Sequence, residues 1–218
     1  NLTIFPDKQL ADYRSNITGQ PDSVNIRKQQ MDTRGSDISF IIDQLEKLQN
    51  GSIKSTLNGK LDLQKIAVAG HSYGGSTATV AAHKDERIKA CAVLDSWLSP
   101  VPEPIISAGI HVPFLFMGRP TWEGSDYPGN YPRLDSLLAH SSEPKYRMVI
   151  KNTLHQDYTD IPLFSPIIGY VMQVGDLSPA ISLTLINRLT HGFLDKHLLG
   201  RNGNKFDQIL MNDLIIRF

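Results

Sequence analysis

One stretch of the sequence limits the possible folds more than any other: a short apolar run that passes directly into a serine flanked by glycines. The run Lys65-Ile66-Ala67-Val68-Ala69-Gly70 is typical of a parallel strand covered on both faces. The segment Gly70-His71-Ser72-Tyr73-Gly74 follows it, and the small residues at 74–82 favour a helix packed close to that strand. So sharp a turn from strand to helix requires flanking positions without side chains, which Gly70 and Gly74 provide. The pattern predicts a strand, a tight turn that exposes Ser72, and a helix.

Further strands and helices alternate along the chain. Apolar residues recur at helical spacing in two segments, and short apolar runs bounded by polar loops occur in three others. We predict helices at residues 38–48 and 178–199 and strands at residues 90–94, 112–117 and 146–150. This alternation is typical of an α/β fold with a mostly parallel sheet covered by helices. We expect a single domain over residues 1–218, with a polar loop at 1–30 and the core at 31–218.

Composition excludes several functional classes. The 22 Lys and Arg residues balance 22 Asp and Glu residues and are dispersed, so the chain lacks the basic footprint of a nucleic-acid-binding protein. No run approaches the about 18 to 20 consecutive apolar residues of a membrane-spanning helix. A single cysteine, Cys91, excludes an intrachain disulfide and a cysteine-based zinc cluster, and its apolar neighbours favour a buried strand position. We expect no transmembrane segment and no nucleic-acid partner.

A serine at such a turn becomes a nucleophile only with a general base and a carboxylate that orients the base. His155 and Asp95 each come shortly after a later predicted strand, so both lie at the edge where the carboxyl ends of parallel strands meet. The order Ser72, Asp95, His155 is that of α/β-hydrolases. Glu123 and Asp126 follow a different strand, and position alone leaves the choice of acid open between them and Asp95. The pattern predicts an α/β-hydrolase fold with a serine nucleophile.

Three blocks of the sequence resemble the platelet-activating-factor acetylhydrolase family, which carries G-H-S-F-G-G, L-D-A-W and H-Q-N-F-A-D. The resemblance extends from about residue 26 to about residue 208. The matching blocks are Ile66-Ala67-Val68-Ala69-Gly70-His71-Ser72-Tyr73-Gly74-Gly75, Leu94-Asp95-Ser96-Trp97 and His155-Gln156-Asp157-Tyr158-Thr159-Asp160.

The resemblance assigns roles to particular residues. It implies that Ser72 is the nucleophile, Asp95 the acid and His155 the base, which selects Asp95 over the other candidate carboxylates. Tyr73 replaces the phenylalanine of the family, and this change leaves its backbone N–H able to act as an oxyanion donor. An acyl pocket is expected at apolar residues near the same sheet edge, namely Trp97, Leu98 and Trp122.

The implied function is hydrolysis of carboxylic esters through an acyl-enzyme, with a phospholipase A2-type release of short acyl groups. No metal and no organic cofactor are required for this chemistry. Two alternatives stay open because a fold and a triad do not determine the substrate. One is an esterase, lactonase or polyester hydrolase acting on a non-phospholipid ester, and the other is a non-catalytic hydrolase-like binding module.

The chain departs from the family pattern at its start. Only 64 residues precede Lys65, which is too few for the early strands of a hydrolase sheet and for the loop with the second oxyanion donor. We therefore expect a partner polypeptide, the amino-terminal half of the same precursor, which completes the sheet and the oxyanion hole.

Three Asn-x-Ser/Thr acceptors predict a secreted glycoprotein. They begin at Asn1, Asn16 and Asn50. Residues 1–20 lack the basic and apolar regions of a signal peptide, so we expect a mature or processed chain.

Overall fold

A five-stranded sheet forms the centre of the computed structural model, which describes residues 2–4, 10–12, 23–122, 129–165, 167–201 and 204–218. The strand order is β3-β4-β5-β6-β7; the first four strands are parallel and β7 is antiparallel to β6. The strands are β3 (Ile66–His71), β4 (Ile88–Leu94), β5 (Phe114–Gly118), β6 (Lys145–Ile150) and β7 (Ile215–Arg217). The predicted mostly parallel α/β sheet is confirmed, and each predicted strand lies within two residues of an observed one.

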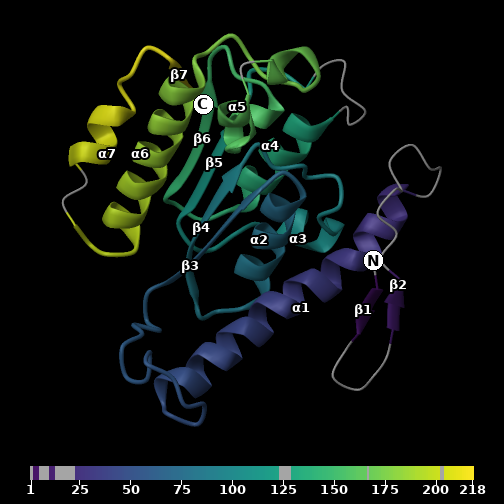
Figure 1. Cartoon of the computed structure of the whole chain (residues 1–218), viewed down its shortest axis with the longest axis vertical. Helices are drawn as coiled ribbons and strands as arrows, with labels where there is room; N and C mark the ends of the chain where they lie inside the picture. Colours follow the sequence, from purple (N-terminus) through teal and green to yellow (C-terminus); the bar gives the residue numbers. More distant parts are fainter. Residues whose placement is uncertain (1, 5–9, 13–22, 123–128, 166, 202–203) are drawn as a thin grey trace.

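Helices cover both faces of this sheet (Figure 1). One face carries α1 (Ser23–Gln49), α2 (Tyr73–Lys84), α3 (Glu103–Ala108) and α4 (Asn130–His140). The other carries α6 (Pro179–His197) and α7 (Asn204–Ile209). Three short helices, η1 (His155–Tyr158), α5 (Ile161–Phe164) and η2 (Ile168–Tyr170), follow β6. Within the described ranges, no helix combines the length and apolar character that crossing a bilayer requires.

Alternation along the central strands divides the core between the two faces. In β4, Cys91 and Val93 pack toward the α2 side, whereas Ala90 and Ala92 pack toward the α6 side. The neighbouring β5 alternates in the same way because successive side chains of a strand point to opposite faces. Cys91 is fully buried, and burial raises the pKa of its thiol. The expected buried strand position of this cysteine is confirmed.

The expected polar loop at residues 1–30 is wrong in two places. Helix α1 begins at Ser23, and two short strands, β1 (Leu2–Ile4) and β2 (Leu10–Asp12), pair in an antiparallel sheet. The early part of α1 is polar, but Met31 is fully buried in the core. The phenol of Tyr73 also donates a 2.7 Å hydrogen bond to the Arg27 carbonyl. Tertiary contacts therefore stabilise a helical segment that has no local apolar period.

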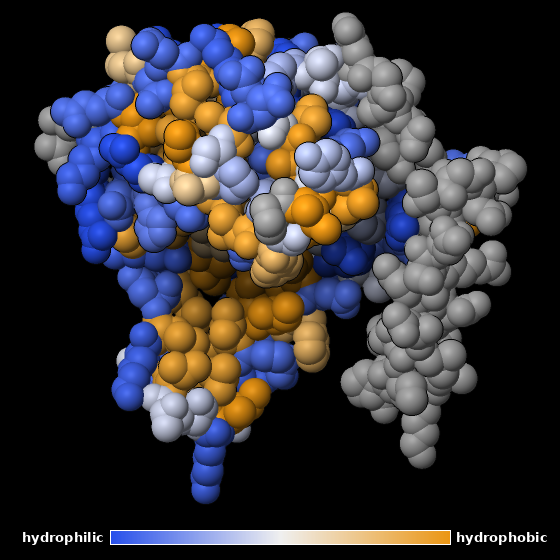
Figure 2. Space-filling model, turned by 45° about the horizontal axis from the view of Figure 1, so that its top comes forward, coloured by the Kyte–Doolittle hydropathy of each residue, from blue (hydrophilic) through white to orange (hydrophobic). Residues whose placement is uncertain are grey.

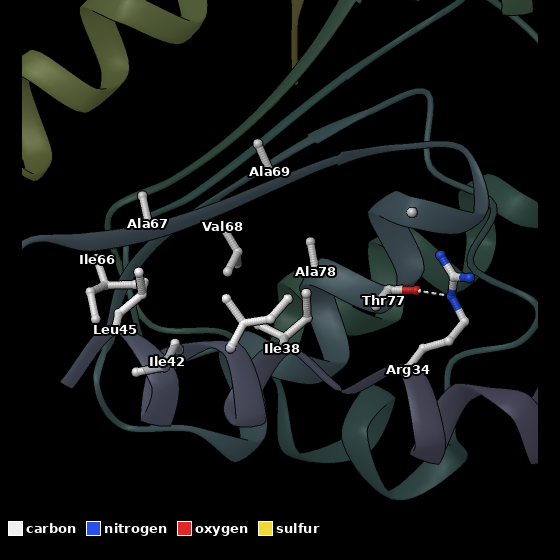
Figure 3. Close-up of a pocket in the computed structure, with 12 residues that line it drawn as sticks. Arg34, Ile38, Ile42, Leu45, Ile66, Ala67, Val68, Ala69, Thr77 and Ala78 are labelled. Atoms are coloured by element: carbon white, nitrogen blue, oxygen red, sulfur yellow. Dashed lines mark hydrogen bonds between the residues drawn. The ribbon is translucent and has the colours of Figure 1, made fainter. Parts of the chain in front are cut away.

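Strand β3 lies at the edge of the described sheet, with β4 on one side only. Beside it, between β3 and α1, is an apolar groove of about 410 Å³ (Figure 3). Figure 2 shows apolar side chains gathered in a hollow where α1 projects from the body of the molecule. We call this surface the β3 groove; its principal apolar residues are Ile38, Ile41, Ile42, Leu45, Ile66 and Val68.

The glycines around the turn between β3 and α2 differ in what they contact. A Cβ on Gly70 would lie 2.2 Å from the Gly74 carbonyl oxygen, and one on Gly75 would lie 2.6 Å from the Ser96 Cβ. A Cβ on Gly74 would meet no atom within 4 Å. The close approach of strand and helix therefore requires glycine at 70 and 75. The expectation that Gly74 must lack a side chain is wrong on this steric criterion.

We predict opposite effects for two alanine substitutions in this turn. Gly70→Ala forces backbone atoms apart and lowers the free energy of unfolding by about 1 to 3 kcal/mol, the range of overpacked cores. Gly74→Ala replaces a helical glycine in open space, so it is neutral or stabilising by up to about 1 kcal/mol. Urea denaturation midpoints measure both effects, and equal midpoints for the two variants would contradict the prediction.

Candidate active site

The residues proposed as nucleophile, base and acid lie in one hydrogen-bonded chain. Ser72 Oγ lies 3.0 Å from His155 Nε2, and His155 Nδ1 lies 2.6 Å from Asp95 Oδ2. The three residues follow the carboxyl ends of β3, β6 and β4, respectively. Asp95 is fully buried, and the His155 side chain is 20% exposed. This geometry suits transfer of a proton from the serine hydroxyl to the imidazole.

Ser72 and Asp95 have backbone conformations that residues other than glycine rarely adopt. Their φ angles are 56° and 40°, and among the described non-glycine residues only Asn152 also has a positive φ. The Ser72 amide donates to the Leu94 carbonyl at 2.9 Å, and the Asp95 amide donates to the Met117 carbonyl at 2.6 Å. Hydrogen bonds to neighbouring strands thus hold both residues in strained conformations. Strain of this kind is concentrated at functional sites.

His71 supports the loop that carries His155. Its Nε2 lies 3.1 Å from the His155 carbonyl oxygen, and the two imidazole rings are tilted by 37° with centroids 4.5 Å apart. Because a carbonyl only accepts, this His71 nitrogen carries the proton. Burial, with a further contribution from His155, lowers the pKa of His71 to about 4. His71 is therefore neutral near neutral pH and adds no second positive charge beside His155.

Tyr73, the predicted oxyanion donor, is the first residue of α2. Its amide belongs to the first turn of that helix, where amides point along the axis toward the N-terminal end. Its ring is fixed from α1: the guanidinium carbons of Arg27 and Arg34 lie 5.2 and 4.8 Å from the ring centre. Helix α1 therefore holds the side chain next to Ser72, while the oxyanion role of the amide stays a prediction.

The three residues expected in an acyl pocket occupy different environments. The Trp97 amide donates to the Ser72 carbonyl at 3.2 Å, and the Trp122 ring packs edge-on against the His155 ring at 5.9 Å. Both tryptophans thus lie beside the site. Leu98 is fully buried in the core on the α2 side, so the structure gives it a packing role.

Two residues of the site were not predicted from the sequence. Asn130 is fully buried; its amide group donates to the Ser96 carbonyl at 2.9 Å and accepts from the Leu98 amide at 2.6 Å. It thereby fixes the loop that follows Asp95. Arg119, directly after β5, contacts the Asp95 carboxylate through its backbone and its side chain. Its place at the carboxyl end of a strand was a usable signal, because His155 and Asp95 were found in the same way.

Several predicted positions fall outside the described residues: Glu123, Asp126, Asn1 and Asn16. Asn50 is described and is exposed at the end of α1. Within the described ranges, no three His, Cys, Asp or Glu side chains gather in a group suited to a metal ion.

Comparison with known proteins places this site in a family context. The family model described as "Platelet-activating factor acetylhydrolase, isoform II" matches residues 7–213. The platelet-activating factor acetylhydrolase of Canis lupus familiaris is 26% identical over 211 residues, which are 91% of this chain and 46% of that protein. The protein of the same name from Bos taurus is 31% identical over 157 residues, 71% of this chain and 34% of that one. The chain thus spans about half the length, or less, of these relatives.

A solved structure supports the same fold. A ferulic acid esterase from Streptomyces cinnamoneus superposes with a TM-score of 0.73 at 22% identity, covering 100% of this chain and 62% of that one. At this identity the likeness concerns the α/β-hydrolase fold alone. The family model covers nearly the whole sequence, and the chain belongs to the family of platelet-activating factor acetylhydrolase, isoform II.

Proposed function

We propose that this chain carries the catalytic centre of a serine hydrolase that cleaves carboxylic esters through an acyl-enzyme. The observation that carries the proposal is the hydrogen-bonded chain from Ser72 through His155 to Asp95. The family description names an acetylhydrolase and the solved neighbour is an esterase, which supports ester hydrolysis as the reaction class.

In the proposed mechanism, His155 Nε2 accepts the Ser72 proton as the serine oxygen attacks the ester carbonyl. Asp95 holds the Nδ1–H tautomer and stabilises the imidazolium that forms. The Tyr73 amide donates to the developing oxyanion. The imidazolium then protonates the leaving alcohol as the acyl-enzyme forms. Water, deprotonated by His155, attacks the acyl group. The imidazolium then returns the proton to Ser72 Oγ as the bond between the acyl group and the serine breaks, which releases the acid and restores both residues.

Substitutions in this chain of residues should separate catalysis from folding. Ser72→Ala and His155→Ala should each reduce kcat by about 10⁴-fold or more, and Asp95→Asn should reduce it by about 10⁴-fold. The control His140→Ala removes an exposed imidazole at the end of α4 and should leave kcat unchanged. Kinetics of the full-length protein on a soluble ester, together with its urea denaturation, measure both properties.

The competing assignments predict other results. Glu123→Gln and Asp126→Asn should have mild effects, and a greater loss from either than from Asp95→Asn would move the acid to the loop after β5. A fluorophosphonate probe should label Ser72. Absence of labelling in the full-length protein would favour the non-catalytic binding module.

For the substrate, we propose a lipid ester with a short acyl group, as in phospholipase A2-type hydrolysis. The support is an apolar segment, residues 161–172, which follows η1 closely. Helix α5 in this segment contacts η1, whose first residue is His155. Phe164 is 78% exposed, and Tyr170 is 90% exposed. Such a surface beside a catalytic serine suits a substrate presented at a lipid interface.

The double variant Phe164→Asp/Tyr170→Asp tests this substrate class. It should lower the rate on short-acyl phospholipid in zwitterionic vesicles by at least about tenfold, since each ring loses the about 1.5 to 3 kcal/mol of an apolar side chain leaving water. Its rate on a soluble short-chain ester should stay within twofold. Phe218→Asp is the control, because this exposed ring lies beside Arg147 in the first half of β6, whereas His155 follows the carboxyl end of that strand. Higher wild-type activity on lactones, soluble esters or polyesters, with vesicle rates unaffected by the double variant, would favour the alternative esterase function.

We also propose that a further polypeptide, the amino-terminal half of the same precursor, pairs with β3 and fills the β3 groove. Strand β3 has an unoccupied edge in the described sheet, and exposed strand edges favour pairing with another strand. The groove leaves Ile41 51% exposed. Relatives about twice as long contain enough additional chain for this role. The partner would also supply the second oxyanion donor, since loss of one donor lowers kcat by about 10²- to 10³-fold.

Expression in two parts tests the partner. Residues 1–218 alone should be insoluble or inactive, and co-expression with the amino-terminal half should restore activity. Ile41→Asp should abolish co-purification of the two parts. Its neighbour Phe40, 58% exposed, does not line the groove, so Phe40→Asp is the matched control. A soluble, monomeric and fully active 218-residue chain would contradict the proposal.

We propose further that the protein is secreted and glycosylated at Asn50. The support is the acceptor Asn50-Gly51-Ser52, whose asparagine is exposed. The acceptors at Asn1 and Asn16 stay predictions.

A further inference from the structure

A buried arginine lies against the carboxylate of the proposed catalytic chain. The Arg119 backbone amide donates to Asp95 Oδ1 at 3.1 Å, and its Nε lies 3.3 Å from Asp95 Oδ2. Oδ2 is also the oxygen that contacts His155 Nδ1. The side chains of Arg119 and Asp95 are 8% and 0% exposed. A buried ion pair gives little net stability, because both charges lose their hydration. Its position therefore points to a role in the site.

The rest of the guanidinium reaches the surroundings of His155 by two routes. Arg119 Nη1 donates to Gln173 Oε1 at 3.1 Å. The backbone carbonyl of Gln173 accepts at 3.0 Å from the backbone amide of Gln156, the residue that follows His155. The guanidinium carbon also lies 4.0 Å from the centre of the Trp122 ring, which packs against the His155 ring. The Arg119 guanidinium thus connects Asp95 with the two residues that flank His155, Gln173 and Trp122.

We propose that Arg119 is a positioning residue for this reaction: it holds the Asp95 carboxylate in the orientation that contacts His155 Nδ1. This inference rests on the proposed ester hydrolysis. Arg119 acts through Asp95 and takes no part in bond making.

Other titratable groups surround the Asp95–His155 pair. From β3, His71 faces the base and is neutral near neutral pH because burial lowers its pKa. From α4, the Tyr131 phenol donates to the Arg119 carbonyl, and burial raises its pKa. From η1, burial raises the pKa of Tyr158 and that of Asp157, whose Oδ2 accepts from the Leu154 and Gly175 amides. Burial thus favours the neutral form of each of these groups, whereas Arg119 is charged and in contact with Asp95.

The test is the kinetics of Arg119 variants in the full-length protein, measured on a soluble ester. Arg119→Gln should lower kcat by about 10- to 100-fold through misplacement of the acid, with KM within twofold. Arg119→Lys should restore kcat in part, since an ammonium keeps the charge beside Asp95 but lacks the planar fork.

Arg119→Met is the control for packing, because it keeps the length of the side chain without its charge and N–H donors; it should lower kcat as far as Arg119→Gln does. Arg201→Gln is the control for loss of an arginine elsewhere, because it removes an exposed arginine paired with Asp195; it should change neither kcat nor KM. Wild-type kcat in Arg119→Gln, or a kcat of Arg119→Lys no higher than that of Arg119→Gln, would overturn the proposal.

A second measurement does not depend on turnover. The proton on His155 Nδ1, which lies between the imidazole and Asp95 Oδ2, is followed by NMR in wild type and Arg119→Gln, with His155→Ala used to assign the signal. The signal should shift or weaken in the variant, because the carboxylate is no longer held in place. An identical signal would refute the effect on Asp95 even in an active enzyme. A changed signal in a protein that hydrolyses no ester and is not labelled by a fluorophosphonate would instead refute the proposed function alone.

Discussion

The site depends on parallel pairing of β3 with β4 and of β4 with β5. The residue that follows β3 and the residue that follows β4 each have a positive φ, and each donates its amide to a carbonyl of the next strand, Ser72 to Leu94 and Asp95 to Met117. These bonds compensate for backbone conformations that cost about 1 to 3 kcal/mol each. The sheet register thereby determines where the hydroxyl and the carboxylate project. His155 reaches both from the loop beyond β6.

Buried polar side chains complete the arrangement from elements far apart in the chain. Asn130 at the start of α4 holds the loop after Asp95, and Arg119 after β5 contacts the carboxylate itself. From β3, His71 contacts the backbone of His155. A buried polar group left unpaired carries a penalty of about 1 to 3 kcal/mol, so each of these contacts restricts the loops to one conformation. Strand β3, which directly precedes Ser72, also has an unpaired edge beside the β3 groove in the described sheet.

Local patterns explain which elements were predictable. The central strands and α6 have apolar residues at the period of their own structure, and all were expected within a few residues of their observed bounds. Helix α3 has six residues and is stabilised by burial of Ile105 and Ile106, and β7 has three residues that pair with β6. Neither is long enough for a period to be recognised. The first half of α1 was missed for a related reason, since its contacts are with Tyr73 and the core.

From the residues alone, the four parallel strands in their order, the turn at Ser72 and three side chains that meet at one sheet edge could be predicted. These follow from spacing along the chain, because strand periodicity and the direction of parallel strands are local properties. Only the tertiary structure decided that Gly70, and not Gly74, is required by close packing, and that Arg119 and Asn130 belong to the site. Arg119 and Asn130 each contact a residue that is 24 or more positions away in the chain. Contacts of that range arise only when the sheet has assembled and excluded water from the loops at its carboxyl edge.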